Sequence, residues 1–171
     1  MAQHLKSILA GVTNDTLEKL AFLFALPDDG RSHDGPEPAV TGRVEFSGFF
    51  CGSMVVRISA SVLPELAANM LGSPDDAEIS GEAQQDAFKE LTNVICGNAL
   101  PAIAGDLAEF NIKAPVTLSS TDARNLISKG TSACVVRLAL EEGYCDVYLF
   151  TEEKLTESAA MNLGSENRSC D

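Results

Sequence analysis

The chain has 171 residues, of which 45% are hydrophobic and 22% charged, and this suits one globular domain that buries a core without metals or disulfides. The net charge of -13 argues against a nucleic-acid-binding face, because such binding depends on Lys and Arg neutralising phosphates. The same acidity disfavours an anionic membrane surface, and no apolar run approaches the roughly 18 residues that crossing a bilayer requires. The composition therefore favours a soluble protein with neither nucleic acid nor membrane as a partner.

The N-terminus and the cysteines predict a cytoplasmic location. The opening residues lack the charged start and long apolar region of a signal peptide. The cysteines are odd in number, contain no C-x-x-C pair and fall mostly within apolar patterns, where a free thiol behaves as a small hydrophobic residue. They are Cys51, Cys96, Cys134, Cys145 and Cys170.

The first third of the chain predicts a helix followed by two strands. Apolar residues recur every three or four positions over 5–24, which indicates one amphipathic helix ending before Pro27. A Gly- and Pro-rich loop covers 27–38. Strict alternation over 40–47 predicts a half-buried strand, and a second strand is expected over 50–59.

Two helices are predicted in the middle of the chain. The shorter covers 61–72, with Ser61 as its N-cap and Gly72 as its stop. The longer runs from about Gly81 toward Phe110 and is kinked or divided at Pro101, which lacks a backbone N–H.

The last part of the chain predicts a short strand over 114–118, a polar connection, and a hairpin over 131–151 that turns at Gly143. This order of elements indicates an α+β fold with long helices packed on a mostly antiparallel sheet. We expect one domain over 1–155 and a partly flexible C-terminal segment over 156–171.

A polar stripe on the long helix is the strongest candidate for a functional site. At about 100° per residue, Asp86, Glu90, Asn93 and Gly97 share one side of the helix and face solvent. Glu90 and Asn93 project as neighbours, and Gly97 lets another surface approach closely. Exposed Glu and Asn are also common surface residues, so the spacing alone is a weak signal.

The run from Asp86 through Glu90 to Asn93 resembles the signature of the CheC/CheX/FliY chemotaxis phosphatases, in which Asp or Ser precedes Glu by four residues and Asn follows three later. The opening helix, the strand pair and the helix LPELAANMLG also follow in the order of a CheX-like chain, so that the resemblance covers about 5–150. It implies a CheC/CheX-like fold and hydrolysis of the aspartyl phosphate of a CheY-like response regulator.

The resemblance also implies a role for each residue of the motif. Asn93 would orient the attacking water and Glu90 would pair with the partner's active-site lysine, with Asp86 and Gly97 supporting docking. A neutral amide suits this task, since a carboxylate would bring negative charge toward an anionic phosphoryl group. The chain itself would bind no cofactor, and Mg²⁺ is expected in the partner.

Some relatives carry a second motif on the first helix, but here Glu18 is followed three residues later by Ala21. A single-site, CheX-like protein is therefore the better match, and the resemblance implies a homodimer. The alternative function is a non-catalytic module that binds a response regulator or a flagellar component without hydrolysing its phosphate.

Three rival sites are weaker. His33 lies among acidic residues that could ligate a metal, although a solvated loop is the favoured interpretation; these are Asp28, Asp29, Asp34 and Glu37. The run Ser128 to Thr131 lacks the glycine and the residue order of a phosphate-binding loop. Cys96 is expected to be a buried apolar residue rather than a nucleophile.

Overall fold

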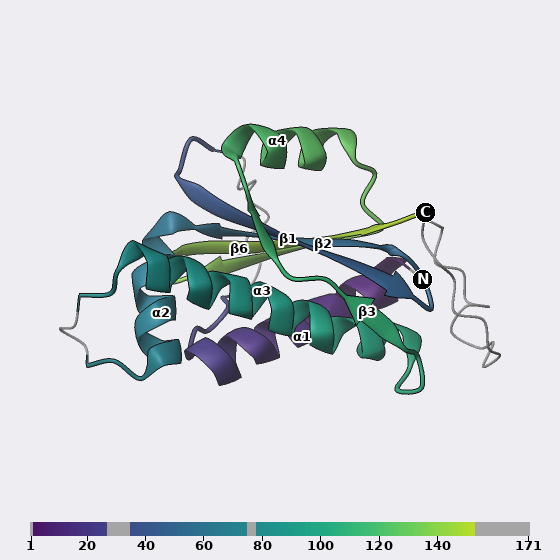
Figure 1. Cartoon of the computed structure of the whole chain (residues 1–171), viewed down its shortest axis with the longest axis horizontal. Helices are drawn as coiled ribbons and strands as arrows, with labels where there is room; N and C mark the ends of the chain where they lie inside the picture. Colours follow the sequence, from purple (N-terminus) through teal and green to yellow (C-terminus); the bar gives the residue numbers. More distant parts are fainter. Residues whose placement is uncertain (1, 27–34, 75–77, 153–171) are drawn as a thin grey trace.

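The computed structural model describes residues 2–26, 35–74 and 78–152, which form one sheet with helices on both of its faces (Figure 1). All strand pairings are antiparallel, in the order β3-β1-β2-β6-β5, and β4 also pairs with β1. The strands are β1 (Ala39–Gly48), β2 (Gly52–Ser59), β3 (Phe110–Ile112), β4 (Val116–Leu118), β5 (Cys134–Leu140) and β6 (Gly143–Thr151). The helices are α1 (Ala2–Ala21), the 3-10 turn η1 (Ala60–Val62), α2 (Leu63–Leu71), α3 (Gly81–Ala104) and α4 (Ser120–Lys129). The predicted α+β class with a mostly antiparallel sheet is confirmed.

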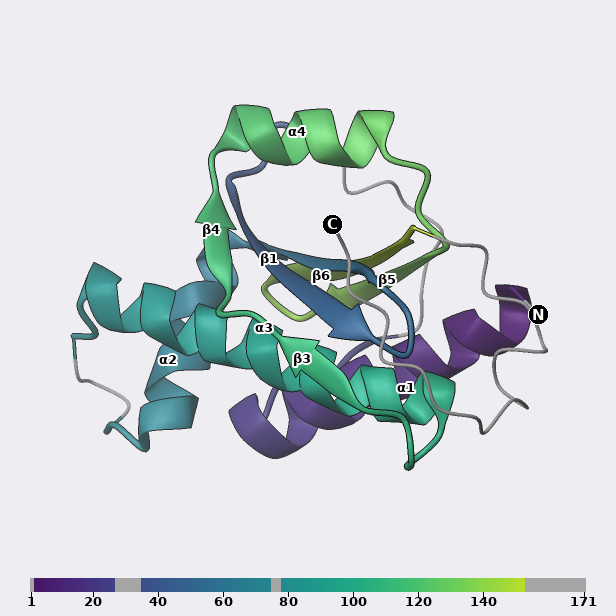
Figure 2. The same cartoon turned by 45° about the vertical axis from the view of Figure 1, so that its right-hand side comes forward.

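The two faces of the sheet are covered differently. Helices α1, α2 and α3 lie on one face, and α4 lies on the other, as Figures 1 and 2 both show. The predicted alternation of β1 is confirmed over its later part, where Val44 and Phe46 are buried while Arg43 and Glu45 are partly exposed. It is wrong at the start of the strand, where Thr41 is buried and Val40 is half-buried. The site on α3 therefore sits on the outer surface of a helical layer that the sheet supports.

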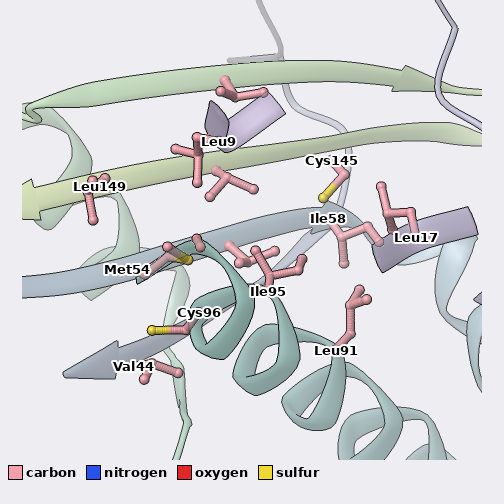
Figure 3. Packing of buried hydrophobic residues seen from close by; sticks show 14 of the residues in the cluster. Leu9, Leu17, Val44, Met54, Ile58, Leu91, Ile95, Cys96, Cys145 and Leu149 are labelled. Carbon is pink, nitrogen blue, oxygen red and sulfur yellow. The ribbon is translucent and has the colours of Figure 1, made fainter. Parts of the chain in front are cut away.

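The core lies between the sheet and the helical layer (Figure 3). Leu91 and Ile95 of α3 are fully buried there, together with Leu9 and Leu17 of α1 and Met54 of β2. Each buried aliphatic side chain of this kind stabilises the fold by about 1.5–3 kcal/mol relative to exposure. This burial fixes which side of α3 faces inward and, as a result, which side faces solvent.

The cysteines are partly as predicted. Cys96, Cys134 and Cys145 are free and buried, as expected of small apolar residues. Cys51, in the turn between β1 and β2, is instead disulfide-bonded, and its partner lies outside the described residues. The prediction of free thiols is thus wrong for Cys51.

The first helix ends earlier than its apolar pattern predicts. It stops at Ala21, and Phe22 adopts a left-handed conformation with φ 53°, which is costly for a residue with a side chain. The amide of Asn69 on α2 donates a hydrogen bond of 2.7 Å to the Ala21 carbonyl, which satisfies one helix-terminal acceptor. Phe24, which the pattern places in the helix, lies beyond its end and is 62% exposed. Leu26 forms an isolated β-bridge with Ala139 of β5.

Two predicted helix boundaries are wrong for local reasons. Ser61 does not cap α2, because its hydroxyl donates instead to the Glu142 carbonyl at 2.6 Å. Helix α3 ends at Ala104 rather than near Phe110, since the backbone at Gly105 takes φ 96° and the chain turns away. Pro101 sits within the last turn of α3.

One helix was not predicted. The polar connection after β4 forms α4, whose N-cap Ser119 accepts a hydrogen bond from the Asp122 amide at 3.1 Å. Gly72 and Gly143, in contrast, both take positive φ at their predicted positions, as the stop of α2 and in the hairpin turn. Residues 27–34 of the predicted loop and the whole segment 156–171 lie outside the described residues.

Candidate functional site

Helix α3 carries the candidate site, and its ends and buried face are well determined by the sequence. Ser80 caps its start by accepting a hydrogen bond from the Ala83 amide at 3.2 Å. Gly42 allows β1 to approach α3 closely, since a Cβ at Gly42 would lie 3.1 Å from both the Phe88 ring and the Thr92 hydroxyl oxygen. Thr92 is itself buried and donates back to the Phe88 carbonyl at 2.9 Å. These contacts hold the neighbours of Glu90 and Asn93 against the sheet.

The predicted polar stripe lies on the opposite side of α3, but only two of its four residues are fully exposed. Asp86 and Glu90 are exposed, while Asn93 and Gly97 are half-buried. A Cβ added at Gly97 would meet no atom within 4 Å, so the space beside this glycine is open. Asp86 forms a long ion pair of 3.8 Å with Lys89, and the carboxylate remains 69% exposed. The stripe thus offers an acid and an amide on a rigid helix.

Neither Glu90 nor Asn93 makes a side-chain hydrogen bond or an ion pair anywhere in the described part of the chain. A carboxylate offers about four acceptor positions, and an amide offers both acceptor and donor capacity. These groups are therefore available to another molecule. Helical geometry places their Cβ atoms about 5–6 Å apart, as expected of residues three positions apart.

A groove between α1 and α3 adjoins this stripe. Its volume is about 450 Å³, and it is lined by Val12, Asp15, Thr16, Lys19 and Leu20 of α1 and by Val94 and Asn98 of α3. A long hydrogen bond of 3.4 Å from the Asn98 amide to the Thr16 hydroxyl oxygen joins the two helices, and both residues line the groove. Glu90, Val94 and Asn98 follow one another at four-residue intervals, so the groove continues directly from the position of Glu90.

The groove was not predicted from the sequence. Its lining residues on α1 form part of an ordinary amphipathic pattern, and nothing in that pattern indicates how closely α1 and α3 pack. Asn98, one position after Gly97, is polar, but its place in the sequence alone does not indicate a groove.

The rival sites find little support among the described residues. Cys96 is fully buried, and this burial raises the pKa of its thiol to about 12, so the thiolate needed for nucleophilic attack is strongly disfavoured. Ser128 and Lys129 belong to the last turn of α4 rather than to a loop before a helix. His33 and its acidic neighbours Asp28, Asp29 and Asp34 lie outside the described residues. Within the described residues, no group of three or more potential metal ligands occurs.

The described residues contain no helix long and apolar enough to cross a membrane.

Solved structures similar to this chain include CheX, CheC-like and FliY proteins. The chemotaxis protein CheX from Desulfovibrio desulfuricans is 19% identical, with a TM-score of 0.63 over 87% of this chain and 99% of that one. CheX in the CheX-CheY-BeF3-Mg²⁺ complex from Borrelia burgdorferi is 16% identical, with a TM-score of 0.62 over 86% and 97%. FliY from Thermotoga maritima is 18% identical, with a TM-score of 0.59 over 88% and 89%. The fold is therefore of the CheC/CheX-like class.

The sequence itself identifies the family. A family model described as chemotaxis phosphatase CheX matches residues 40–138, which is more than half of the chain and includes all of α3. The chain belongs to the CheX family of chemotaxis phosphatases. No curated protein sequence matches it significantly.

Proposed function

We propose that this protein hydrolyses the aspartyl phosphate of a CheY-like response regulator in the cytoplasm. Membership of a chemotaxis phosphatase family supports this activity, as does the fold shared with the Borrelia CheX that forms a complex with CheY. The observation that carries the proposal is the presence of unpaired Glu90 and Asn93 side by side on the solvent face of α3. The active site would be completed by the partner, because phosphoryl transfer chiefly requires correct positioning and charge stabilisation.

Asn93 is the residue that we assign to water positioning. Its amide can accept a hydrogen bond from the attacking water and donate one to another oxygen, without adding negative charge near the phosphoryl group. Mg²⁺ is expected in the partner, and the CheX complex from Borrelia contains this ion together with beryllofluoride. This chain's own contribution is a neutral side chain held at a fixed position on a helix.

Glu90 is assigned to docking. Its exposed carboxylate would pair with the active-site lysine of the response regulator and so align Asn93 with the phosphoryl group. Asp86 and Gly97 support this docking, the first through charge and the second through the open space beside it. The open space matters because a partner must bring its own catalytic cleft down onto the helix.

The test is the lifetime of the aspartyl phosphate on purified CheY-like receiver domains from the same genome, with and without the protein. Acceleration by the wild-type protein, with binding of the beryllofluoride-activated receiver, supports the proposal. Binding without any change in phosphate lifetime would instead establish the non-catalytic interaction module. The homodimer that the family resemblance implies remains a prediction, which light scattering on the purified protein measures directly.

A further inference from the structure

The groove between α1 and α3 has the size and the position of a side-chain pocket beside the proposed site. Its volume of about 450 Å³ is enough for one or two large side chains. Its apolar walls are Val12 and Leu20 on α1 and Val94 on α3. Because Val94 follows Glu90 by one helical turn, a protein that covers Glu90 and Asn93 also covers this end of the groove.

The rim of the groove carries one carboxylate, Asp15, and one ammonium group, Lys19. Asp15 lines the groove with a carboxylate that is 62% exposed, and its only ion-pair partner among the described residues is Lys19. Their ion pair is long, at 3.5 Å, and an exposed pair of this kind contributes little stability. Lys19 is 78% exposed and can swing away from Asp15 at small cost. The carboxylate can therefore accept a second cation.

We propose that this groove is a second docking subsite for the response regulator, and that it receives a lysine or arginine of the partner. The stem of that side chain would lie on Val94 and Leu20, and its charged end would pair with Asp15. A long apolar stem with a cationic end matches both the walls and the rim of the groove. This proposal rests on the proposed function, because the partner is the same response regulator that Glu90 and Asn93 contact.

Such a subsite gives the protein a means of choosing among response regulators. The residues around the aspartyl phosphate are required for the chemistry of the receiver and can differ little between candidates. A contact one or two helical turns away from Asn93 is free of that requirement. Receivers with a basic residue at the facing position would bind, and those with an acidic residue there would be repelled.

The test compares Asp15→Lys with Glu18→Lys. Both substitutions change the charge of α1 by the same amount at exposed positions, but Glu18 does not line the groove. The probe is the receiver domain that the wild-type protein acts on or binds, activated with beryllofluoride for binding and phosphorylated for kinetics. We expect Asp15→Lys to raise both the Kd and the KM about tenfold with kcat within about twofold, since rim charges act mainly on encounter and affinity.

A second variant fills the groove without changing its charge. Asn98→Leu places an apolar side chain at an exposed position and removes the long hydrogen bond to Thr16, and we expect it to raise the Kd about tenfold while the fold, followed by circular dichroism, is retained. Salt provides an independent measurement. The Kd of the wild-type protein should rise with ionic strength more steeply than that of Asp15→Asn, because the latter lacks the screened charge.

The outcomes separate this proposal from the proposed function. Equal effects of Asp15→Lys and Glu18→Lys, or a loss of kcat without a change in Kd, would overturn the groove as a docking subsite. A change in self-association rather than in receiver binding would assign the groove to a second copy of the chain and also overturn it. The proposed function fails only if the wild-type protein leaves the phosphate lifetime unchanged, and in that case the Kd measurements still test the groove.

Discussion

Gly42 of β1 lies directly against Thr92 of α3, so closely that a Cβ on the glycine would come within 3.1 Å of the threonine hydroxyl oxygen. Thr92 is adjacent in sequence to Asn93, and it faces the sheet while Asn93 is half-buried toward the opposite side. The close contact between strand and helix therefore sets the rotation of α3 and the direction in which the candidate site residues project. The absence of a side chain at Gly42 thus helps to orient Asn93 on the outer surface of the helix.

Gly42→Val tests this contact. The new side chain would overpack the space occupied by Phe88 and Thr92, and such overpacking typically costs about 1–3 kcal/mol. We expect the midpoint of urea unfolding to fall accordingly. Gly11→Ala is the matched control, because Gly11 is exposed within α1 with no atom within 4 Å of an added Cβ, and this change should stabilise the protein by about 0.5–1 kcal/mol. An unchanged midpoint for Gly42→Val would show that the contact is loose.

Gly97→Ala separates stability from function. Because the space beside Gly97 is open in the free protein, alanine fits there and should stabilise α3 by about 1 kcal/mol. The added methyl group would, however, meet a partner that approaches the helix closely. We expect a higher melting temperature together with weaker binding of the activated receiver, and a variant that is both more stable and fully active would remove Gly97 from the docking surface.

Ser119→Ala tests the placement of α4 away from the site. The serine caps α4 and also donates a hydrogen bond of 2.6 Å to the Asp122 carboxylate, so its loss should destabilise the protein by about 1 kcal/mol. Because α4 lies on the other face of the sheet from α3, the rate of phosphate loss per folded molecule should not change (Figure 1). Ser120→Ala, at an exposed position within the first turn, serves as the control for a substitution without a capping role. A fall in the rate with Ser119→Ala alone would connect α4 to the site.

The buried thiol of Cys96 predicts a dependence of stability on alkaline pH. Burial raises its pKa from an ordinary value of 9.0 to about 12, so the folded state holds this proton more tightly than the unfolded state. The resulting stability is fully present below the unfolded pKa and is lost as the pH rises through the folded pKa. We expect the free energy of unfolding to fall between about pH 9 and pH 12 more steeply in the wild-type protein than in Cys96→Ala. Parallel curves for the two proteins would contradict this assignment.

The same burial predicts slow chemistry at Cys96. An alkylating reagent should label it in the native protein only as fast as the protein opens, and rapidly once the protein is denatured. Mass spectrometry after a timed pulse measures this difference. Rapid labelling of Cys96 in the native protein would mean that the thiol is accessible, and Cys96 would again be a candidate nucleophile.

The site on α3 could be predicted from sequence because a helical period of 3.6 residues determines which side chains share a face. Leu91 and Ile95 define the buried side, so Glu90 and Asn93 follow on the other. The helix stop at Gly72 and the hairpin turn at Gly143 could be predicted equally well, since each residue takes a positive φ that favours glycine. Such features depend only on residues close together in the chain.

Features that depend on distant residues could not be predicted in this way. Helix α1 ends where Phe22 takes a left-handed conformation, and no glycine stands there to indicate it in the sequence. The end also depends on the hydrogen bond that Asn69 donates from another helix. The hydroxyl of Ser61 finds the carbonyl of Glu142 instead of capping its own helix. The groove likewise exists only because α1 packs beside α3. Helix α4, in contrast, carries a local signal, because Ser119 is followed three residues later by Asp122 in a capping pattern.

The most direct test of the account is the lifetime of the receiver's aspartyl phosphate in the presence of the wild-type protein and of Asn93→Ala, measured alongside the Kd for the beryllofluoride-activated receiver. If Asn93 positions the attacking water, the variant should lose acceleration by about 100-fold or more while its Kd and its melting temperature stay close to those of the wild-type protein. If the Asn93→Ala variant shortens the phosphate lifetime to the same extent as the wild-type protein, this result would contradict the central claim.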